Sequence, residues 1–309
     1  MHHKMVAGSQ LSQTAGAPDH VSCVAAMEKQ PQFAVEQGRP HPSDQALDRA
    51  MFALRMQRPE EAEQIAAGVL KASKRNVHAA VIHGQALMAQ NRAEEAVVSL
   101  EKAARRSDDP TAATVLASAL AAAGRAEEAL LRLRAIIARR PAFPPAFREL
   151  ARQLDLAGRT SEAIAMLEAG LELAPDLVDL RADLGVLRLK SHDRAGARVA
   201  FAQARELAPG RHDICAALAR VLLADGDLTA AADVFRRALA LQPDDAALRA
   251  DFGRCLLEMG ERDAGEDALR VAANEPLMFS RIIMTLAASS HGRFFMRPSR
   301  AEKFLRGRM

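Results

Sequence analysis

The sequence has no tryptophan, no tyrosine and only three cysteines among its 309 residues. Cys23, Cys215 and Cys255 are odd in number and widely spaced, which argues against a disulfide scaffold or a zinc ribbon and is typical of a reducing compartment. No stretch of about 18 apolar residues is free of charge, so no transmembrane helix is predicted. The early apolar cluster at residues 21–27 is too short and too interrupted for an export signal. We therefore expect a cytoplasmic protein.

The formal net charge is only +3, and it is unevenly distributed along the chain. From Pro276 onward seven arginines and lysines face a single acid, Glu302, so this part carries +6 and the preceding residues carry about −3. The basic character therefore belongs to a tail and not to the body of the protein. Beyond Gly292 the basic tail includes Arg297, Arg300, Lys303, Arg306 and Arg308.

A repeat of 34 residues runs through most of the chain. Small residues stand at the eighth, twentieth and twenty-seventh places of each unit, and large apolar residues stand at the seventh, eleventh and twenty-fourth places. The small residues let two helices approach closely, and a proline after them ends the second helix because it lacks an amide donor. Since Ala, Leu and Arg favour helix, each unit predicts a pair of helices. The clearest unit has Leu184, Gly185, Ala197, Phe201, Ala204 and Pro209, and the prolines are Pro141, Pro175, Pro209 and Pro243.

The turn between the two helices of a unit has its own signal. At one repeat place, where the first helix must end, four units have glycine and two others have asparagine or histidine. Glycine accepts the left-handed conformation that closes many helices, and asparagine and histidine are enriched there among the other residue types. We therefore predict positive φ at Gly124, Gly158, Gly226, Gly260, Asn91 and His192.

These residues resemble the tetratricopeptide repeat family, whose pattern also spans 34 residues. The resemblance implies an all-α fold, a right-handed superhelical solenoid of antiparallel helix pairs with about seven repeats and a C-terminal capping helix. Arg49 stands where leucine belongs in the first unit, so the register there is open. We expect residues 1–42 to be disordered and residues 278–309 to form the capping helix and the basic tail. The units of the solenoid, 43–277, fall near 43–76, 77–109, 110–143, 144–177, 178–211, 212–245 and 246–277.

No catalytic motif stands out in the sequence. It has no phosphate loop, no G-x-G-x-x-G, no H-E-x-x-H and no G-x-S-x-G. The histidines are scattered, and His83 occupies a core place of its unit, where a structural histidine is expected. We therefore predict no enzyme, no catalytic residue, no cofactor and no metal site.

The resemblance places a partner-binding groove on the first helices, at the fifth, ninth and twelfth places of the units. The fifth and ninth places hold several arginines, and arginine binds carboxylates in a bidentate way, so an acidic peptide is the expected ligand. Arginine makes up most of the basic residues, however, so ordinary solvent-facing arginines are the alternative interpretation. The predicted groove residues are Gln85, Ser118, Arg148, Arg152, Arg220 and Arg254, with an apolar stripe of Leu189, Leu223 and Leu257 beside them.

The function predicted from the sequence is that of a bacterial scaffold or adaptor that binds a partner protein, with no small-molecule substrate. One alternative is a regulatory or targeting subunit of a separately encoded transferase. Another is attachment of the basic tail to nucleic acid or to an anionic membrane, although stacking platforms for bases are few without tryptophan and tyrosine. The tail itself has three open interpretations: it folds back along the convex face of the solenoid, docks an acidic partner, or touches an anionic membrane surface.

Overall fold

The computed structural model describes residues 42–139, 141–292 and 297–306. All regular structure in these ranges is helical, with sixteen α-helices and one 3-10 helix and no strand. The all-α prediction is therefore confirmed. The predicted disordered segment lies outside the described residues except for Pro42, which begins the first helix, and Arg308 of the basic tail also lies outside them.

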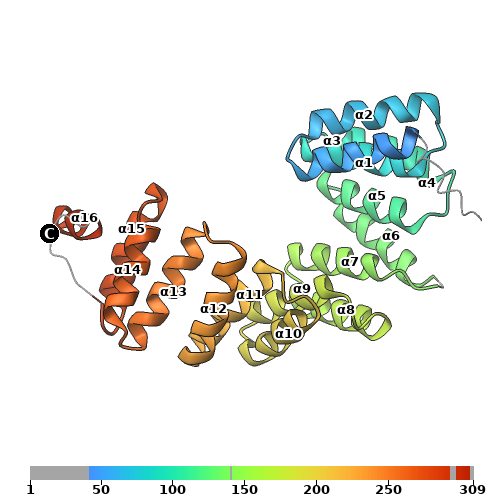
Figure 1. The fold of residues 1–309 in the computed structure, drawn as a ribbon. Coiled ribbons are helices and arrows are strands. Elements are labelled where there is room, and N and C mark those ends of the chain that lie inside the picture. The colour runs from blue at the N-terminus through green and yellow to red at the C-terminus, as the bar shows by residue number, and fades with distance from the viewer. Residues whose placement is uncertain (1–41, 140, 293–296, 307–309) are drawn as a thin grey trace, which may run out of the picture. The chain divides into compact units, whose positions relative to one another are not determined.

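The helices form successive hairpins, each made of two helices that pack against one another (Figure 1). Seven such pairs run from α1 and α2 to α13 and α14 in the described part of the chain. The first helices of the pairs are α1 (Pro42–Arg55), α3 (Val77–Ala89), α5 (Pro110–Ala122), α7 (Pro144–Leu156), α9 (Val178–Lys190), α11 (His212–Ala224) and α13 (Ala246–Glu258). The second helices are α2 (Pro59–Ala72), α4 (Ala93–Ala104), α6 (Ala126–Ile137), α8 (Thr160–Leu173), α10 (Arg194–Leu207), α12 (Leu228–Leu241) and α14 (Arg262–Ala272).

The turn inside every hairpin contains one residue with positive φ. All six residues predicted for this place have it, from 62° at Asn91 to 84° at Gly260. A seventh, Gln57 at 56°, occupies the same place between α1 and α2. Glutamine is not a residue type that favours this conformation, so the sequence carried no signal for it. Its position puts the first hairpin in phase with the others, and Arg49 lies exposed while Leu47 and Ala50 are buried.

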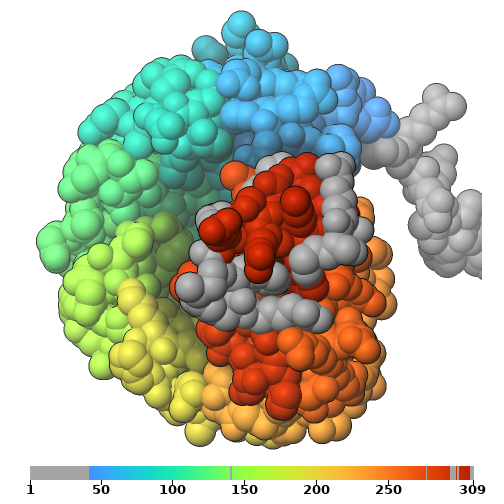
Figure 2. Space-filling view, turned by 90° about the vertical axis from the view of Figure 1, so that its left-hand side faces the viewer, coloured from blue at the N-terminus to red at the C-terminus, as the bar shows by residue number. Residues whose placement is uncertain are grey.

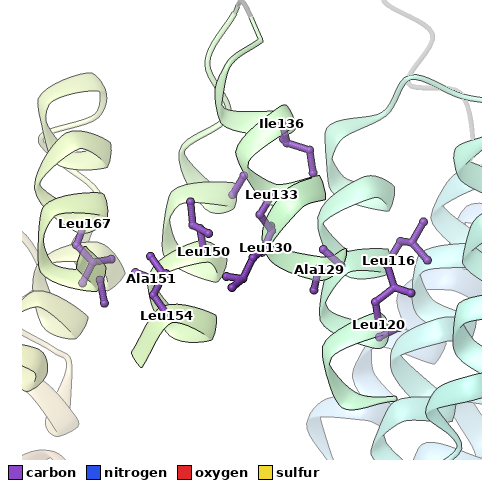
Figure 3. Packing of buried hydrophobic residues seen from close by; sticks show 14 of the residues in the cluster. Leu116, Leu120, Ala129, Leu130, Leu133, Ile136, Leu150, Ala151, Leu154 and Leu167 are labelled. Carbon is purple, nitrogen blue, oxygen red and sulfur yellow. The ribbon is translucent and has the colours of Figure 1, made fainter. Parts of the chain in front are cut away.

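The two helices of a hairpin approach so closely that side-chain size decides the packing. A Cβ added at Gly185 would lie 2.7 Å from the ring of Phe201, and one added at Gly84 would lie 2.6 Å from Leu100 Cδ1. A small residue on the first helix is therefore paired with a large one on the second. Figure 3 shows the buried cluster around α5 to α8, in which Ala129 of a second helix and Ala151 of a first helix lie among leucines.

The first helices of neighbouring hairpins lie closer together than the second helices do. In the described part, α3 packs against α5, α5 against α7 and α7 against α9, whereas no two successive second helices reach comparable contact. At these steps the stack is therefore narrower on the side of the first helices, and we call the side formed by the first helices the inner face.

The C-terminal residues cover the last hairpin. After a 3-10 turn at Pro276–Met278, α15 (Phe279–Ala288) contacts α13 and α14 and buries Ile282 and Leu286. The last helix, α16 (Pro298–Leu305), buries Ala301, Phe304 and Leu305. Figure 2 shows these red helices against the orange helices of the last hairpin.

Of the three interpretations of the tail, the structure therefore favours packing on the solenoid. The guanidinium of Arg270 lies 4.5 Å from the ring centre of Phe304 and covers it. The basic side chains of Arg297, Arg300, Lys303 and Arg306 are exposed, and Arg306 pairs with Glu302. None of the helices in the described ranges has the length and apolar character needed to cross a membrane.

Candidate binding surface on the first helices

A hollow of about 600 Å³ opens on the inner face between α3, α5, α7 and α9. Gln85 of α3 and Ser118 of α5 line it together with Arg148 and Arg152 of α7. These are four of the nine groove residues predicted from the sequence. The stacking of the hairpins brings them together because each lies at a groove place of its own first helix.

The hydroxyl groups of the hollow are already used inside α5. Thr114 Oγ1 donates to the carbonyl oxygen of Pro110 at 2.7 Å, and Ser118 Oγ donates to that of Thr114 at 3.3 Å. On the other side, Val186 of α9 is 55% exposed and also lines the hollow. Val186, the exposed Pro145 and the half-buried Val115 are therefore apolar contacts that the hollow offers to a ligand.

Arg148 and Arg152 do not project freely into the hollow. Arg148 Nε lies 2.5 Å from Asp183 Oδ2 of α9, and its Nη1 lies 3.6 Å from Asp179. Arg152 donates from Nε and Nη2 to the two carboxylate oxygens of Glu149 at 2.9 and 2.6 Å. Hydrogen bonds that the two guanidinium groups donate to these carboxylates raise the pKa of both arginines, which stay charged.

Glu149 is the most enclosed carboxylate of the hollow. Burial alone would raise its pKa, but hydrogen bonds from Arg152 and Gln153 outweigh burial and the pKa lies below the usual range. The carboxylate is thus an anion that competes directly with any acidic ligand for Arg152. Its spacing from Arg152, three residues along one helix, is a signal that sequence reasoning could have used.

Arg220 and Arg254, the predicted arginines of the later repeats, differ from one another. Arg220 Nε lies 2.7 Å from Oδ2 of the buried Asp251, and Arg281 of α15 binds the other oxygen of the same carboxylate at 2.5 Å. The carboxylate of Asp251 on α13 therefore links Arg220 of α11 with Arg281 of α15. Arg254 is exposed and makes no hydrogen bond or ion pair with the described residues.

The predicted apolar stripe needs correction. Leu223 is 8% exposed and Leu257 is fully buried, while Leu189 is half-buried. Leu257 turns toward the second helix of its own hairpin, where a Cβ on Gly265 would lie 2.9 Å from its Cγ. The twelfth place of these units therefore belongs to the core, and it offers no stripe beside the arginines.

The histidine and cysteine side chains considered as candidates for catalysis or metal binding are partly or fully buried. His83 is half-buried with its Nδ1 3.1 Å from Ser99 Oγ, and burial lowers its pKa. Cys215 and Cys255 are buried, and burial raises the pKa of both thiols, that of Cys255 to about 11. The described residues contain no group of three or more histidines, cysteines and acids placed to hold a metal ion.

Stacked helical hairpins with a side-chain-lined inner face define a helical repeat protein. One family model described as tetratricopeptide repeat matches residues 47–113 and 182–246, and a second model with the same description matches residues 222–277. These ranges together cover just over half of the sequence. The chain belongs to the tetratricopeptide repeat family, which indicates a protein–protein interaction scaffold. No curated protein matches its sequence.

Solved structures show the same fold at low sequence identity. The human IFIT1 dimer with m7Gppp-AAAA is 17% identical with a TM-score of 0.57, and the match covers 80% of this chain and 63% of that one. The APC/C hetero-tetramer Cut9-Hcn1 is also 17% identical, with a TM-score of 0.54, and the match covers 80% of this chain and 50% of that one. The chain thus spans between half and two thirds of the length of these proteins.

Proposed function

We propose that this chain is a non-enzymatic cytoplasmic scaffold that binds an extended segment of a partner protein along the inner face, centred on the hollow between α3 and α9. The observation that carries the proposal is the convergence of predicted groove residues from three successive first helices in this one hollow. Its volume of about 600 Å³ lies within the range of ligand pockets, roughly 300–1,000 Å³.

We propose that the partner segment is acidic, and its carboxylates must then displace those already bound to the arginines of the hollow. Because Asp183 and Glu149 already neutralise Arg148 and Arg152, the carboxylates of a partner must replace them. Exchanging one half-exposed ion pair for another changes the free energy by only ~0–1 kcal/mol. Apolar contacts with the lining, Val186 and Pro145 among them, must therefore supply much of the affinity, while the exchange of carboxylates selects the partner. Arg254, which has no competitor among the described residues, adds a free cation farther along the inner face.

This displacement of carboxylates predicts opposite changes in affinity for two kinds of variant. Labelled peptides that combine acidic and large apolar residues are titrated with the full chain, and fluorescence anisotropy reports binding. The charge-reversed variant R148E/R152E should weaken binding at least about 10-fold, since like charges then face the peptide. Asp183→Asn should tighten binding by up to about 5-fold, because it removes the competitor of Arg148.

The control is Arg237→Glu, a charge reversal at an exposed residue of a second helix. It should leave the affinity within about twofold of the original, because long-range charge effects are screened. Equal binding by the original chain and R148E/R152E would rule out the hollow as the site. Tighter binding by Asp183→Asn supports carboxylate exchange, whereas weaker binding means that Asp183 itself contacts the partner and that the acidic requirement is wrong. The natural partner can be sought by affinity capture with R148E/R152E as the matched negative.

A further inference from the structure

A second hollow, of about 360 Å³, lies where the α2–α3 connection meets the outer end of α4. Four cationic side chains line it: Lys74 and Arg75 of the connection, Lys102 of α4 and Arg106 just after α4. All four residues are exposed, and the lining also includes the apolar side chains of Leu70 and Val77. The lining contains no carboxylate. We name this set of residues the cationic hollow.

The absence of a carboxylate distinguishes the cationic hollow from the neighbouring ones. The hollow on the inner face pairs Arg148 and Arg152 with Asp183 and Glu149. A hollow on the other side of Lys102 contains three glutamates, and the one beside Arg132 and Arg139 contains two aspartates. Unlike these three hollows of the described residues, the cationic hollow therefore gathers cations without an acid in its lining.

The contacts within the cationic hollow leave its charges uncompensated. Arg106 Nη1 donates to the backbone carbonyl oxygen of Lys74 at 3.1 Å, which joins the two sides of the hollow without neutralising either. Lys74, Arg75 and Lys102 form no ion pair with any described residue. Glu101, the acid next to Lys102 in sequence, pairs with Arg105 outside the hollow.

Four like charges around a depression of this size favour a ligand that carries more than one negative charge. A carboxylate brings one charge and two acceptor atoms, whereas a phosphate group brings up to two charges and three acceptor oxygens. Lysine serves phosphate as a point charge and arginine serves it as a fork of donors. We propose that the cationic hollow binds the phosphate groups of a small soluble compound, at a site separate from the inner face.

The test uses the full chain and inorganic triphosphate as the probe, with isothermal titration calorimetry as the readout. The variant K74Q/K102Q should bind triphosphate at least about 10-fold more weakly, because each charged hydrogen bond lost contributes appreciably to the affinity. The matched control R237Q/K303Q removes the same net charge from exposed residues elsewhere and should bind within about twofold of the original. Circular dichroism melts should coincide for all three proteins, since the four residues are exposed.

Two further arms distinguish phosphate from other anions and soluble ligands from lipids. Citrate, a small tricarboxylate, should bind at least about 10-fold more weakly than triphosphate, since its charge is spread over three separate groups. Vesicles containing a phosphorylated inositol lipid should not retain the chain better than vesicles of neutral lipid. Failure of triphosphate to bind, or equal binding by K74Q/K102Q, would overturn the proposal. Citrate binding as tightly as triphosphate would overturn its phosphate character, and vesicle retention without triphosphate binding would replace the soluble ligand with a lipid headgroup.

Discussion

Gly265→Ala is the substitution for which the repeat pattern and the packing make opposite predictions. Alanine is usual at the twentieth place of the repeat, and alanine in a helix interior is favoured over glycine by about 1 kcal/mol. The pattern therefore predicts that the substitution stabilises the last hairpin. The packing around α14 predicts the reverse.

The structure places Gly265 directly against the backbone of the facing helix. A Cβ at this position would lie 2.9 Å from the carbonyl oxygen of Gly253 and 2.9 Å from Leu257 Cγ. A flexible side-chain end could move away from such a contact, but the carbonyl oxygen moves only if α13 shifts. Overpacking of this kind costs about 1–3 kcal/mol, which exceeds the gain in helix propensity. We expect Gly265→Ala to lower the free energy of unfolding of this region by up to ~2 kcal/mol.

Gly68→Ala is the matched control, because Gly68 also lies inside a second helix but a Cβ there would meet no atom within 4 Å. It should stabilise the chain by ~0.5–1 kcal/mol. Urea unfolding followed by far-UV circular dichroism compares the variants, and hydrogen exchange of peptides from α13 and α14 locates the change, since repeat arrays can unfold in parts. If Gly265→Ala stabilised the chain as much as Gly68→Ala, the close approach of the two backbones would be refuted.

Three other predictions follow from single residues. Gln57→Gly should stabilise the first hairpin by about 1 kcal/mol in urea unfolding, because it removes the cost of a left-handed conformation in a residue with a Cβ; an unchanged midpoint would contradict the backbone assigned to this turn. Phe304→Ala should release α16, seen as faster amide exchange over residues 298–305 with α1 to α12 unchanged, since the ring is 4% exposed in the last cluster; unchanged exchange would mean that α16 is held otherwise. Raising the pH from about 9 to 11 should lower the free energy of unfolding by ~2 kcal/mol through Cys255, because the thiol loses its proton at a lower pH in the unfolded chain than in the folded one. In Cys255→Ala, urea unfolding over the same pH range should not show this loss.

The fold was predictable because each repeat of the sequence marks the positions where its two helices pack and where the chain turns between them. Small residues at the eighth and twentieth places mark where two helices touch, and Gly185 against Phe201 shows the reason. Glycine, asparagine and histidine marked six of the seven left-handed turns. The positive φ of Gln57 was not predicted, because the surrounding hairpin and not the residue type holds this conformation. Local preference and tertiary packing agree in six turns, and packing prevails in the seventh.

The candidate site was predictable in position but not in charge. Gln85, Ser118, Arg148 and Arg152 meet in one hollow because groove places recur with the repeat. The partner of Arg148 was not anticipated, because that ion pair depends on which residue of the next hairpin lies opposite, whereas Glu149 lies three residues from Arg152 on the same helix. The burial of Leu257 was also missed, since it depends on the close approach of the second helix at Gly265 and on the packing of α15 over the last hairpin.

Several of these ion pairs nevertheless follow the period of the repeat. Arg148 reaches Asp183 across 35 residues and Arg220 reaches Asp251 across 31, so both bonds join first helices of successive hairpins. Lys190 and Asp155 do the same across 35 residues. These three ion pairs between first helices therefore span about one repeat, because that is the distance at which the next first helix lies alongside, whereas Arg152 pairs with Glu149 of its own helix. The cationic hollow lies instead around a connection and the end of a second helix. The hollow at the corresponding place one repeat later contains Asp108 and Asp109 from its connection, whereas the connection here supplies Lys74 and Arg75.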